Sequence, residues 1–255
     1  MIIYKSPEEL AKMRKAGRIV AGTIERVLAA VRVGVTTAEL DTVAEVFIRE
    51  QGATPSFLGY GQPPFPASIC TSLNDEIVHG IPSPKRVAGD GDLLKLDFGA
   101  IWEGFHADSA VTVIVGEPPS AEAEKLVRVT SDALEAGIST IRAGGRLSDI
   151  GAGVQQVAEG AGFSVVREYV GHGIGRSLHE DPQIPNYGEA GRGPVLKPGL
   201  VIAVEPMVNV GGWETRVLAD DWTVVTQDGS LSAHFEHTIA VTEDGPEVLT
   251  ARGVG

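Results

Sequence analysis

VRVGVTTAELDTVAEVFIREQGA, residues 31–53, has a counterpart in IRAGGRLSDIGAGVQQVAEGAGF, residues 141–163. The two stretches align at an offset of 110 residues, so that Gly34 meets Gly144 (144 minus 34). This period is much longer than that of a solenoid repeat. It predicts an α+β fold of two related halves around a shared core, with a site between them. Two ordinary helix pairs with glycine stops would be the simpler explanation of the similarity.

Each copy of the repeat belongs to a predicted pair of helices. Ser6 and Glu9 form a capping box, and Pro7 suits the first helical position. Gly52 is placed to end the second helix of the first pair. The predicted helices cover residues 6–30, 37–51, 120–142 and 148–161.

Runs rich in β-branched and aromatic residues predict the strands. LLKLDFGA (93–100) and FHADSAVTVIV (105–115) flank the short stretch IWEG, which predicts a β-hairpin. Residues 53–92 contain GQPPFP and GIPSP, and these prolines predict irregular structure. Further strands are expected over residues 163–170, 200–209, 221–226 and 234–242.

The composition is that of an ordinary soluble protein. The chain has 255 residues, 43% hydrophobic and 22% charged, which is enough to bury a core. Its formal net charge of −13 argues against a nucleic-acid-binding surface. Cys70 has no partner cysteine, which favours a reducing compartment. Neither a signal peptide nor a membrane-spanning apolar run is evident, so we expect a cytoplasmic protein.

GHGIGRSLHE (171–180) concentrates glycine and histidine after a strand-like run. It lacks the spacing of a dinucleotide-binding loop, and Pro182 and Pro185 make a following helix unfavourable. The glycines are expected to let the backbone turn tightly and approach a ligand. His172 and His179 would lie at the two ends of that turn, although a lone loop histidine is commonly just solvated.

Four carboxylates occupy β-rich runs that usually exclude them. Asp97 and Asp108 lie in the two arms of the hairpin, where the turn brings them near each other. Adjacent carboxylates repel unless a cation or proton lies between them. Glu205 ends a very apolar strand and Glu236 lies inside another, where a lone carboxylate costs several kcal/mol. The ordinary alternative for the aspartates is a solvent-facing pair at a sheet edge.

These four carboxylates and His172 form an oxygen-rich set that suits two divalent ions such as Mn²⁺, Fe²⁺, Co²⁺ or Zn²⁺. Two such ions can activate a water molecule for hydrolysis. The spacing alone does not prove that the five residues meet. Three further histidines receive no role, because strand histidines are usually structural: His106, His234 and His237.

Six motifs follow one another over essentially the whole chain. They are KMRKAGRIVAG (12–22), CTSLNDEIVHGIP (70–82), GDLLKLDFGAIWEGFHADSA (91–110), GFSVVREYVGHGIGRSLHEDPQIPNY (162–187), LKPGLVIAVEPMV (196–208) and SLSAHFEHTIAVT (230–242). Together they resemble the type I methionine aminopeptidases of peptidase family M24. The resemblance implies the pita-bread fold, with a curved antiparallel sheet covered by helices. It implies one catalytic domain over residues 1–255, with pseudo-symmetric halves of about 1–115 and 116–255.

The resemblance also implies roles for the metal set. Asp108 and Glu236 would bridge two divalent ions, and Asp97 would chelate one of them. His172 and Glu205 would complete the other. Glu205 is the expected proton shuttle from water to the leaving amine.

Two histidines resemble the family's substrate-facing pair. His179 would donate to the developing oxyanion, and His79 would contact the scissile amide nitrogen. An apolar methionine pocket is expected from Phe57, Tyr60, Phe65, Cys70 and Trp222. The stretch LGYGQPPFP is longer than is usual in the family. A monovalent cation, Na⁺ or K⁺, is expected near Asn74 and Ser232.

The implied function is removal of the N-terminal methionine from nascent chains, with a small uncharged second residue preferred. The alternatives are an Xaa-Pro aminopeptidase or prolidase of the same fold, which usually carries a large extra N-terminal domain, and a non-catalytic binding protein. The chain begins directly at the catalytic region, so any contact with the ribosome near its exit tunnel would use the catalytic domain. We expect a monomer that binds neither specific DNA nor membranes.

Overall fold

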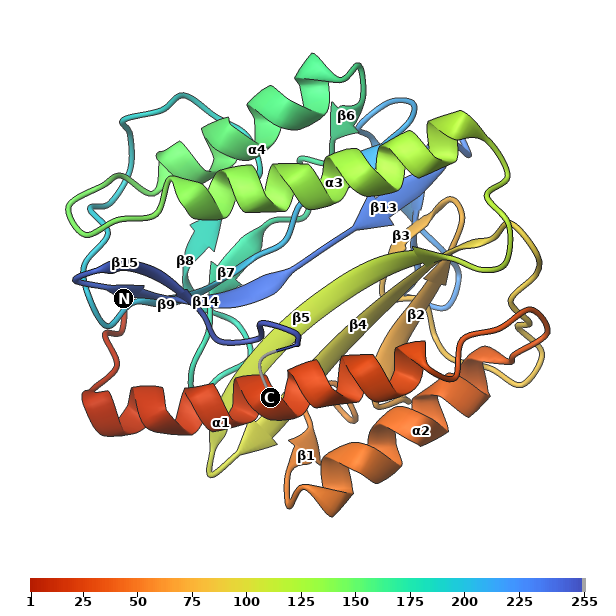
Figure 1. Cartoon of the computed structure of the whole chain (residues 1–255), viewed down its shortest axis with the longest axis horizontal. Coiled ribbons are helices and arrows are strands. Elements are labelled where there is room, and N and C mark those ends of the chain that lie inside the picture. The colour runs from red at the N-terminus through yellow and green to blue at the C-terminus, as the bar shows by residue number, and fades with distance from the viewer. Residues whose placement is uncertain (254–255) are drawn as a thin grey trace.

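Two pairs of helices flank a set of antiparallel strands in the computed structural model, which describes residues 1–253 (Figure 1). The helices α1 and α2 lie along one edge of the strands in this view, and α3 and α4 along the other. Their bounds are α1 Pro7–Leu28, α2 Thr37–Glu50, α3 Ala121–Ser139 and α4 Ser148–Gly160. All four predicted helices and the α+β class are therefore confirmed.

The first helix shows why the predictions from local sequence succeed. The Ser6 hydroxyl accepts a hydrogen bond from the Glu9 backbone N–H, and the Glu9 side chain accepts one from the Ser6 N–H. Pro7 occupies the first turn, where its missing N–H costs nothing. The buried face of α1 packs against β4 (Leu93–Trp102) and β5 (Phe105–Ile114), and α3 packs against β5, β9 (Val201–Val204), β10 (Met207–Asn209) and β13 (Ser232–His234). Within residues 1–253, no helix is long and apolar enough to cross a membrane.

Every strand pairing is antiparallel. The strands are β1 Thr54–Pro55, β2 Ile69–Leu73, β3 Glu76–Val78, β4 Leu93–Trp102, β5 Phe105–Ile114, β6 Ser164–Val165, β7 Gly171–Gly173, β8 Glu180–Ile184, β9 Val201–Val204, β10 Met207–Asn209, β11 Thr215–Val217, β12 Val224–Thr226, β13 Ser232–His234, β14 His237–Thr242 and β15 Gly245–Val248. One sheet joins β1 and β2 to one side of β4 and β5 to the other, and a second has the order β15-β14-β9-β7-β8. The smaller sheets are β13-β10-β6 and β11-β12-β3.

The repeated sequence forms the same local structure twice. The Gly34 N–H donates to the carbonyl of Ala88 at 2.8 Å, and the Gly144 N–H donates to that of Leu196 at 2.9 Å. Both glycines have a positive φ, +85° and +82°, which a residue with a side chain rarely adopts. The two stretches therefore close equivalent turns before α2 and α4. The division of the chain into halves near residue 115 stays a prediction.

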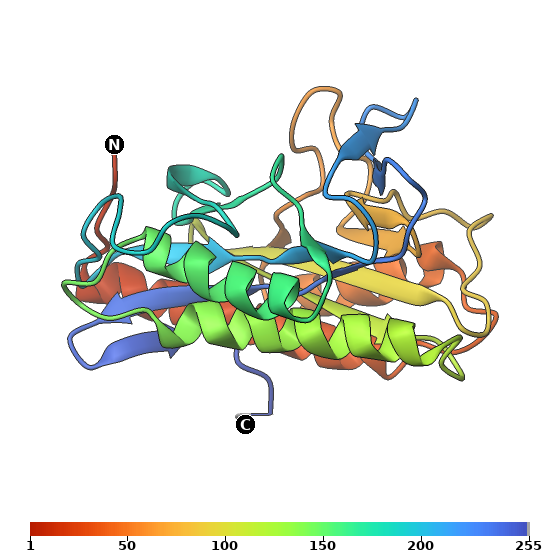
Figure 2. The same ribbon diagram turned by 90° about the horizontal axis from the view of Figure 1, so that it is seen from above.

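Side-chain hydroxyls join the early strand β5 to the late strands β13 and β14. Thr112 donates to the carbonyl of His234 at 2.7 Å, and Thr238 donates to that of Asp108 at 2.7 Å. These hydrogen bonds connect chain segments that are more than a hundred residues apart. Here the threonine hydroxyls, in place of backbone N–H groups, satisfy the backbone carbonyls. Figure 2 shows the loops near residues 57–65 and 213–222 rising on the side of the molecule opposite α3.

Three of the predicted long strands are interrupted. The run 163–170 forms only β6 before the chain becomes irregular. The run 200–209 divides into β9 and β10, and the run 234–242 divides into β13 and β14. The prediction of Glu236 inside a continuous strand is therefore wrong, because it lies in the gap between β13 and β14. Hydrophobic runs do not reveal such gaps, since the flanking residues on both sides are buried.

Candidate active site and metal centre

One cavity gathers side chains from distant parts of the sequence. Its lining contains all five residues of the predicted metal set, both histidines predicted to face the substrate and all five predicted pocket residues. The carboxylates and His172 make one part of the wall, and aromatic side chains and a thiol make another. Leu178 also lines the cavity and was not predicted. Its only signal in the sequence is its place next to His179.

The hairpin places Asp97 and Asp108 on the same face of the sheet. Asp97 pairs with Ala110, and Asp108 pairs with Gly99, so the two aspartates are diagonal neighbours. The turn between the strands consists of Glu103 and Gly104, both with positive φ, as a tight two-residue hairpin requires. The predicted closeness of the aspartates is confirmed. The alternative of a solvent-facing pair is wrong, because Asp108 is buried.

Both glutamates sit where paired strands are interrupted. Glu205 lies between β9 and β10, and Glu236 lies between β13 and β14. β9 pairs with β14 and β10 pairs with β13, so the two gaps face each other. The Glu236 N–H still donates to the carbonyl of Ala110 at 3.1 Å, and Asn186 holds the Glu205 carbonyl at 3.0 Å. Because neither glutamate belongs to a regular strand, its side chain does not have to follow the alternation of side chains between the two faces of the sheet.

His172 enters the site from β7, which is paired to both β8 and β9. Its Nδ1 lies 2.9 Å from the carbonyl of Gly173. A carbonyl only accepts, so Nδ1 carries the proton and Nε2 is left unprotonated. Nε2 lies 3.4 Å from Glu205 Oε1 and 4.0 Å from Asp108 Oδ2. The imidazole therefore presents to the carboxylates an unprotonated nitrogen, the form that a metal ligand requires.

The glycines around His172 are required by neighbouring backbone. A Cβ on Gly171 would lie 2.4 Å from the carbonyl oxygen of Ala203, and one on Gly173 would lie 2.1 Å from that of Asp181. Neither glycine has a positive φ. A close approach of the backbone at these glycines is present, and it is made to the adjoining strands. As predicted, no helix follows; Pro182 lies in β8.

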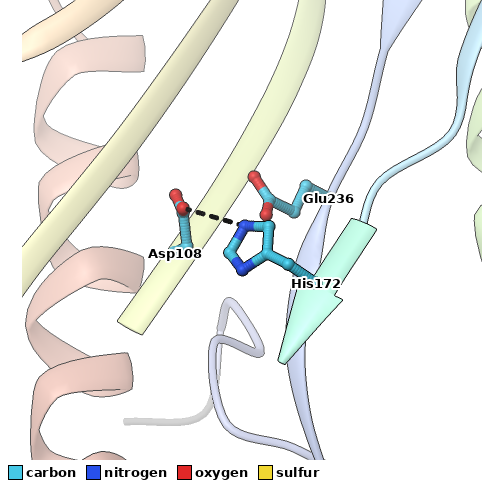
Figure 3. A group of neighbouring side chains, drawn as sticks. All are labelled: Asp108, His172 and Glu236. Carbon is cyan, nitrogen blue, oxygen red and sulfur yellow. Dashed lines mark ion pairs between the residues drawn. The ribbon is translucent and has the colours of Figure 1, made fainter. Parts of the chain in front are cut away.

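Figure 3 shows Asp108, His172 and Glu236 pointing toward one another from β5, β7 and the gap before β14. One ligand atom from each lies within 4.8 Å of the others. Burial raises the pKa of Asp97 to about 7. Burial and the neighbouring carboxylates raise the pKa values of Asp108, Glu205 and Glu236 well above their usual range. Such a group of buried acids is unfavourable when ionised without a counterion.

The donor set fits a divalent metal. Within residues 1–253, one buried carboxylate oxygen of each of Asp97, Asp108 and Glu236 has no hydrogen-bond partner. A divalent cation would satisfy these oxygens and offset the repulsion between the carboxylates. Burial lowers the pKa of His172 to about 3, so its imidazole is neutral and can act as a ligand.

His79 and His179, which are predicted to face the substrate, line the same cavity. The ring of His179 lies 4.3 Å from that of His172, and its Nδ1 lies 2.5 Å from the hydroxyl of Tyr60. His79 follows β3 with a φ of +60°, a strained conformation that is concentrated at functional sites. Burial lowers the pKa of His79 to about 4 and also lowers that of His179. Both rings are therefore neutral at pH 7.

A family model described as metallopeptidase family M24 matches residues 11–243. The chain belongs to metallopeptidase family M24. It is 54% identical over 250 residues to methionine aminopeptidase 1 of Bacillus subtilis (strain 168), covering 98% of this chain and 99% of the relative. The crystal structure of a methionine aminopeptidase from Thermotoga maritima matches it with a TM-score of 0.96 and 45% identity, over 99% of this chain and 100% of that one.

A solved structure with a different activity in its name is less similar. An Xaa-Pro dipeptidase structure from Bacillus anthracis matches with a TM-score of 0.76 and 28% identity. That match covers 97% of this chain but only 61% of the dipeptidase. These matches confirm the predicted pita-bread fold and the resemblance to the methionine aminopeptidases. As a metallopeptidase of this family, the chain is an enzyme that uses divalent metal.

Aromatic side chains form the apolar part of the cavity in this M24 enzyme. Phe57 and Phe65 are buried, and the ring of Phe65 meets Trp222 edge-on at 5.1 Å. Burial and the nearby carboxylates raise the pKa of the Cys70 thiol. Tyr60 is the most exposed of the predicted pocket residues, at 39%. The structure thus brings the five predicted residues together, and their contact with methionine remains a prediction.

The three histidines without a predicted role differ in their surroundings. His106 Nδ1 lies 3.0 Å from Ser56 Oγ, and His237 Nδ1 lies 2.8 Å from Thr250 Oγ1, so both are held as structural residues. His234 is buried beside the metal set, with its Nε2 3.9 Å from Glu205 Oε2. Neither of its ring nitrogens has a hydrogen-bond partner within the described chain. Its sequence context, a strand-like run, did not distinguish it from the others.

A lysine lies at the predicted monovalent-cation position. The Asn74 carbonyl accepts a hydrogen bond from the Ser232 N–H at 3.1 Å, as the expected neighbourhood requires. It also accepts one from the Lys95 amine at 2.7 Å. Lys95 is buried, and burial lowers its pKa to about 7. The Asn74 carbonyl therefore already accepts hydrogen bonds from two donors.

Proposed function

We propose that this enzyme removes the N-terminal methionine from newly made polypeptides by metal-dependent hydrolysis. One observation carries the proposal: a single cavity holds the carboxylate–histidine set at one part of its wall and the Phe57, Phe65, Cys70 and Trp222 side chains at another. An unbranched thioether side chain suits an aromatic and thiol lining. The reacting peptide bond would then lie between the apolar pocket and the metal set.

Five residues would hold two divalent ions, namely Asp97, Asp108, His172, Glu205 and Glu236. Asp108 and Glu236 would supply oxygen ligands to these ions. The bound metal supplies Lewis acidity and lowers the pKa of water near the peptide carbonyl. Mn²⁺, Fe²⁺, Co²⁺ and Zn²⁺ all suit this mixture of carboxylates and imidazole, and availability decides among them.

The protein's own side chains would move the protons. Glu205 accepts a proton from the attacking water and delivers it to the leaving amine. His179 donates a hydrogen bond to the carbonyl oxygen as negative charge develops there. His79 contacts the scissile amide nitrogen. Both histidines act as neutral rings, consistent with their lowered pKa values.

The carboxylate set also explains why cleavage would be confined to chain ends. In its deprotonated form, a free α-amino group would offer a nitrogen donor to the metal that this set holds, whereas an internal peptide has no such group. We also propose that the enzyme prefers substrates whose second residue is small and uncharged. The monovalent cation is left out of it, because the Lys95 amine binds the Asn74 carbonyl.

The proposal extends to the setting of the reaction. Newly made chains would reach the enzyme in the cytoplasm, near the ribosomal exit tunnel, and the enzyme would act as a monomer. The net charge of −13 gives no support for binding nucleic acid.

A peptide panel separates this function from its alternative. Met-Ala-Ser and Ala-Pro peptides are incubated with metal-loaded protein, and the released amino acids are measured by chromatography. We expect methionine from the first peptide and no cleavage of the second. Cleavage of Ala-Pro peptides alone would replace the proposal with a proline-directed exopeptidase. Cleavage of neither, with metal bound, would favour a binding protein.

A further inference from the structure

Tyr60 holds a contact that a methionine pocket does not need. Its hydroxyl lies 2.5 Å from Nδ1 of His179, and the two rings lie 5.3 Å apart with their planes inclined by 53°. Apolar contact with a thioether would use only the tyrosine ring. The hydroxyl instead faces a side chain to which the proposed function gives a role on the substrate's carbonyl oxygen.

The backbone holds Tyr60 in place. The Tyr60 N–H donates to the Phe57 carbonyl at 2.9 Å, and the Tyr60 carbonyl accepts from the Phe65 N–H at 2.7 Å. Phe57 and Phe65 are both buried. Residues 61–64 therefore project from a closed base, and Tyr60 belongs to the base. The extra length of this loop does not loosen the tyrosine.

The next residue fixes the loop from the other side. Gly61 has a φ of +77°, and a Cβ there would lie 2.5 Å from the Trp222 ring. Trp222 in turn packs edge-on against Phe65. The loop is thus clamped between its own hydrogen bonds and Trp222, so the Tyr60 hydroxyl has a defined position.

We propose that the Tyr60 hydroxyl donates to Nδ1 of His179 and so keeps the proton of the neutral ring on Nε2. This rests on the proposed function, in which His179 donates to the carbonyl oxygen. A neutral imidazole carries one proton, so Nε2–H can donate only if Nδ1 accepts. The hydroxyl is the group that supplies the matching proton. Tyr60 is then a positioning residue that sets both the tautomer and the direction of His179.

The charge state of the hydroxyl is consistent with this role. Burial raises the pKa of Tyr60 above its usual value of 10. The phenol therefore keeps its proton at neutral pH and can donate it. A phenolate would accept from Nδ1–H and would leave Nε2 without a proton.

Kinetics of Tyr60→Phe in two backgrounds tests the inference. On Met-Ala-Ser, we expect Tyr60→Phe to lower kcat by about tenfold, by analogy with the lower end of effects for groups that orient metal-bound histidines, with less than a twofold change in KM. In a His179→Ala background the same substitution should change kcat less than twofold. An equal fall in both backgrounds, or a rise in KM with kcat unchanged, would mean that Tyr60 serves only as pocket wall. Tyr4→Phe, which removes the hydroxyl of another exposed tyrosine, is the matched control and should change neither constant.

A second measurement does not depend on activity. The ¹⁵N shifts of the histidine side chains, with His179 assigned by its loss in His179→Ala, report the tautomer directly. We expect the Nε2–H form in the parent and a mixture in Tyr60→Phe. An Nδ1–H form in the parent would overturn the inference, even if methionine is released. If the parent releases no methionine yet shows the Nε2–H form, the proposed function fails and the hydrogen bond stands.

Discussion

Replacing Asp97 by asparagine should stabilise the metal-free protein at neutral pH. Asp97 is one of four carboxyls buried together, and burial raises its pKa from 3.8 to about 7. Asparagine has nearly the same shape but no charge. The substitution thus removes a source of repulsion at the cost of a proposed metal ligand.

The size of the effect follows from the shift in pKa. A rise of about 3 units, at 1.36 kcal/mol per unit, corresponds to about 4 kcal/mol. Because the folded pKa of Asp97 lies above the unfolded value, its contribution to stability is complete below about pH 4 and is lost as pH rises through about 7. The uncharged asparagine of the Asp97→Asn variant has no such loss. The free energy of unfolding of the variant, relative to the parent, should therefore rise by about 4 kcal/mol between pH 4 and pH 8.

Urea unfolding at several pH values, with a chelator present, measures this difference. The buried histidines also titrate in this range, but they are the same in both proteins, and their contribution is removed when the two are compared. Asp132→Asn changes an aspartate in α3, outside the metal set, and is the matched control, expected to alter stability by less than about 0.5 kcal/mol. Adding Mn²⁺ should narrow the difference at pH 8 from about 4 to about 1 kcal/mol, since metal at about 100 times its Kd stabilises the parent by about 2.7 kcal/mol.

Two results would refute this explanation. The first is a metal-free variant that is less stable than the parent at pH 8, which would mean that Asp97 makes favourable contacts when ionised. The second is a difference that does not change with pH, which would mean that the pKa of Asp97 is the same in the folded and unfolded states.

Four further predictions follow from other contacts. Lys5→Met and Glu180→Met should each cost about 3–5 kcal/mol in urea unfolding, because the two side chains form a buried ion pair at 2.7 Å; the double variant should cost much less than the sum, and additive costs would show that the pair is not coupled. Gly173→Ala should cost about 2 kcal/mol or more, since its Cβ would lie 2.1 Å from a backbone oxygen; a neutral effect would mean that the strands separate easily. Cys70 should react with a disulfide reagent more slowly than free cysteine at pH 8, because burial raises its pKa; equal rates would contradict this. Exchange of Na⁺ and K⁺ for choline should leave the rate of methionine release unchanged, because the Lys95 amine already donates to the Asn74 carbonyl. A fall in the rate beyond about tenfold would show that the enzyme needs a monovalent cation after all.

Local signals account for the parts of the fold that were predicted. The capping box at Ser6 and the positive-φ glycine at Gly52 determine helix ends through contacts within a few residues. The hairpin around Glu103 is likewise set by its own turn and by alternation of side chains. Such features depend on neighbours in the sequence, so the sequence alone indicates them.

The gaps at Glu205 and Glu236 could not be predicted in this way. Each is defined by the facing gap in its partner strand, so it depends on pairing between distant segments. His234 was missed for the same reason, since only the paired strands bring it near Glu205. The closeness of Asp97 and Asp108 was predictable, because one hairpin contains both, whereas their meeting with His172 was not.

The central claim is that metal and Glu205 together release N-terminal methionine, and one experiment tests it most directly. Metal-free protein is supplied with Met-Ala-Ser, then with Mn²⁺ or Co²⁺ added back, beside a Glu205→Gln variant, and released methionine is measured. We predict no release without metal, restored release with it, and a loss of about 10²-fold or more in the variant, whose amide cannot carry the proton. Release by metal-free protein, or a Glu205→Gln variant as active as the parent with the same metal content, would contradict the account.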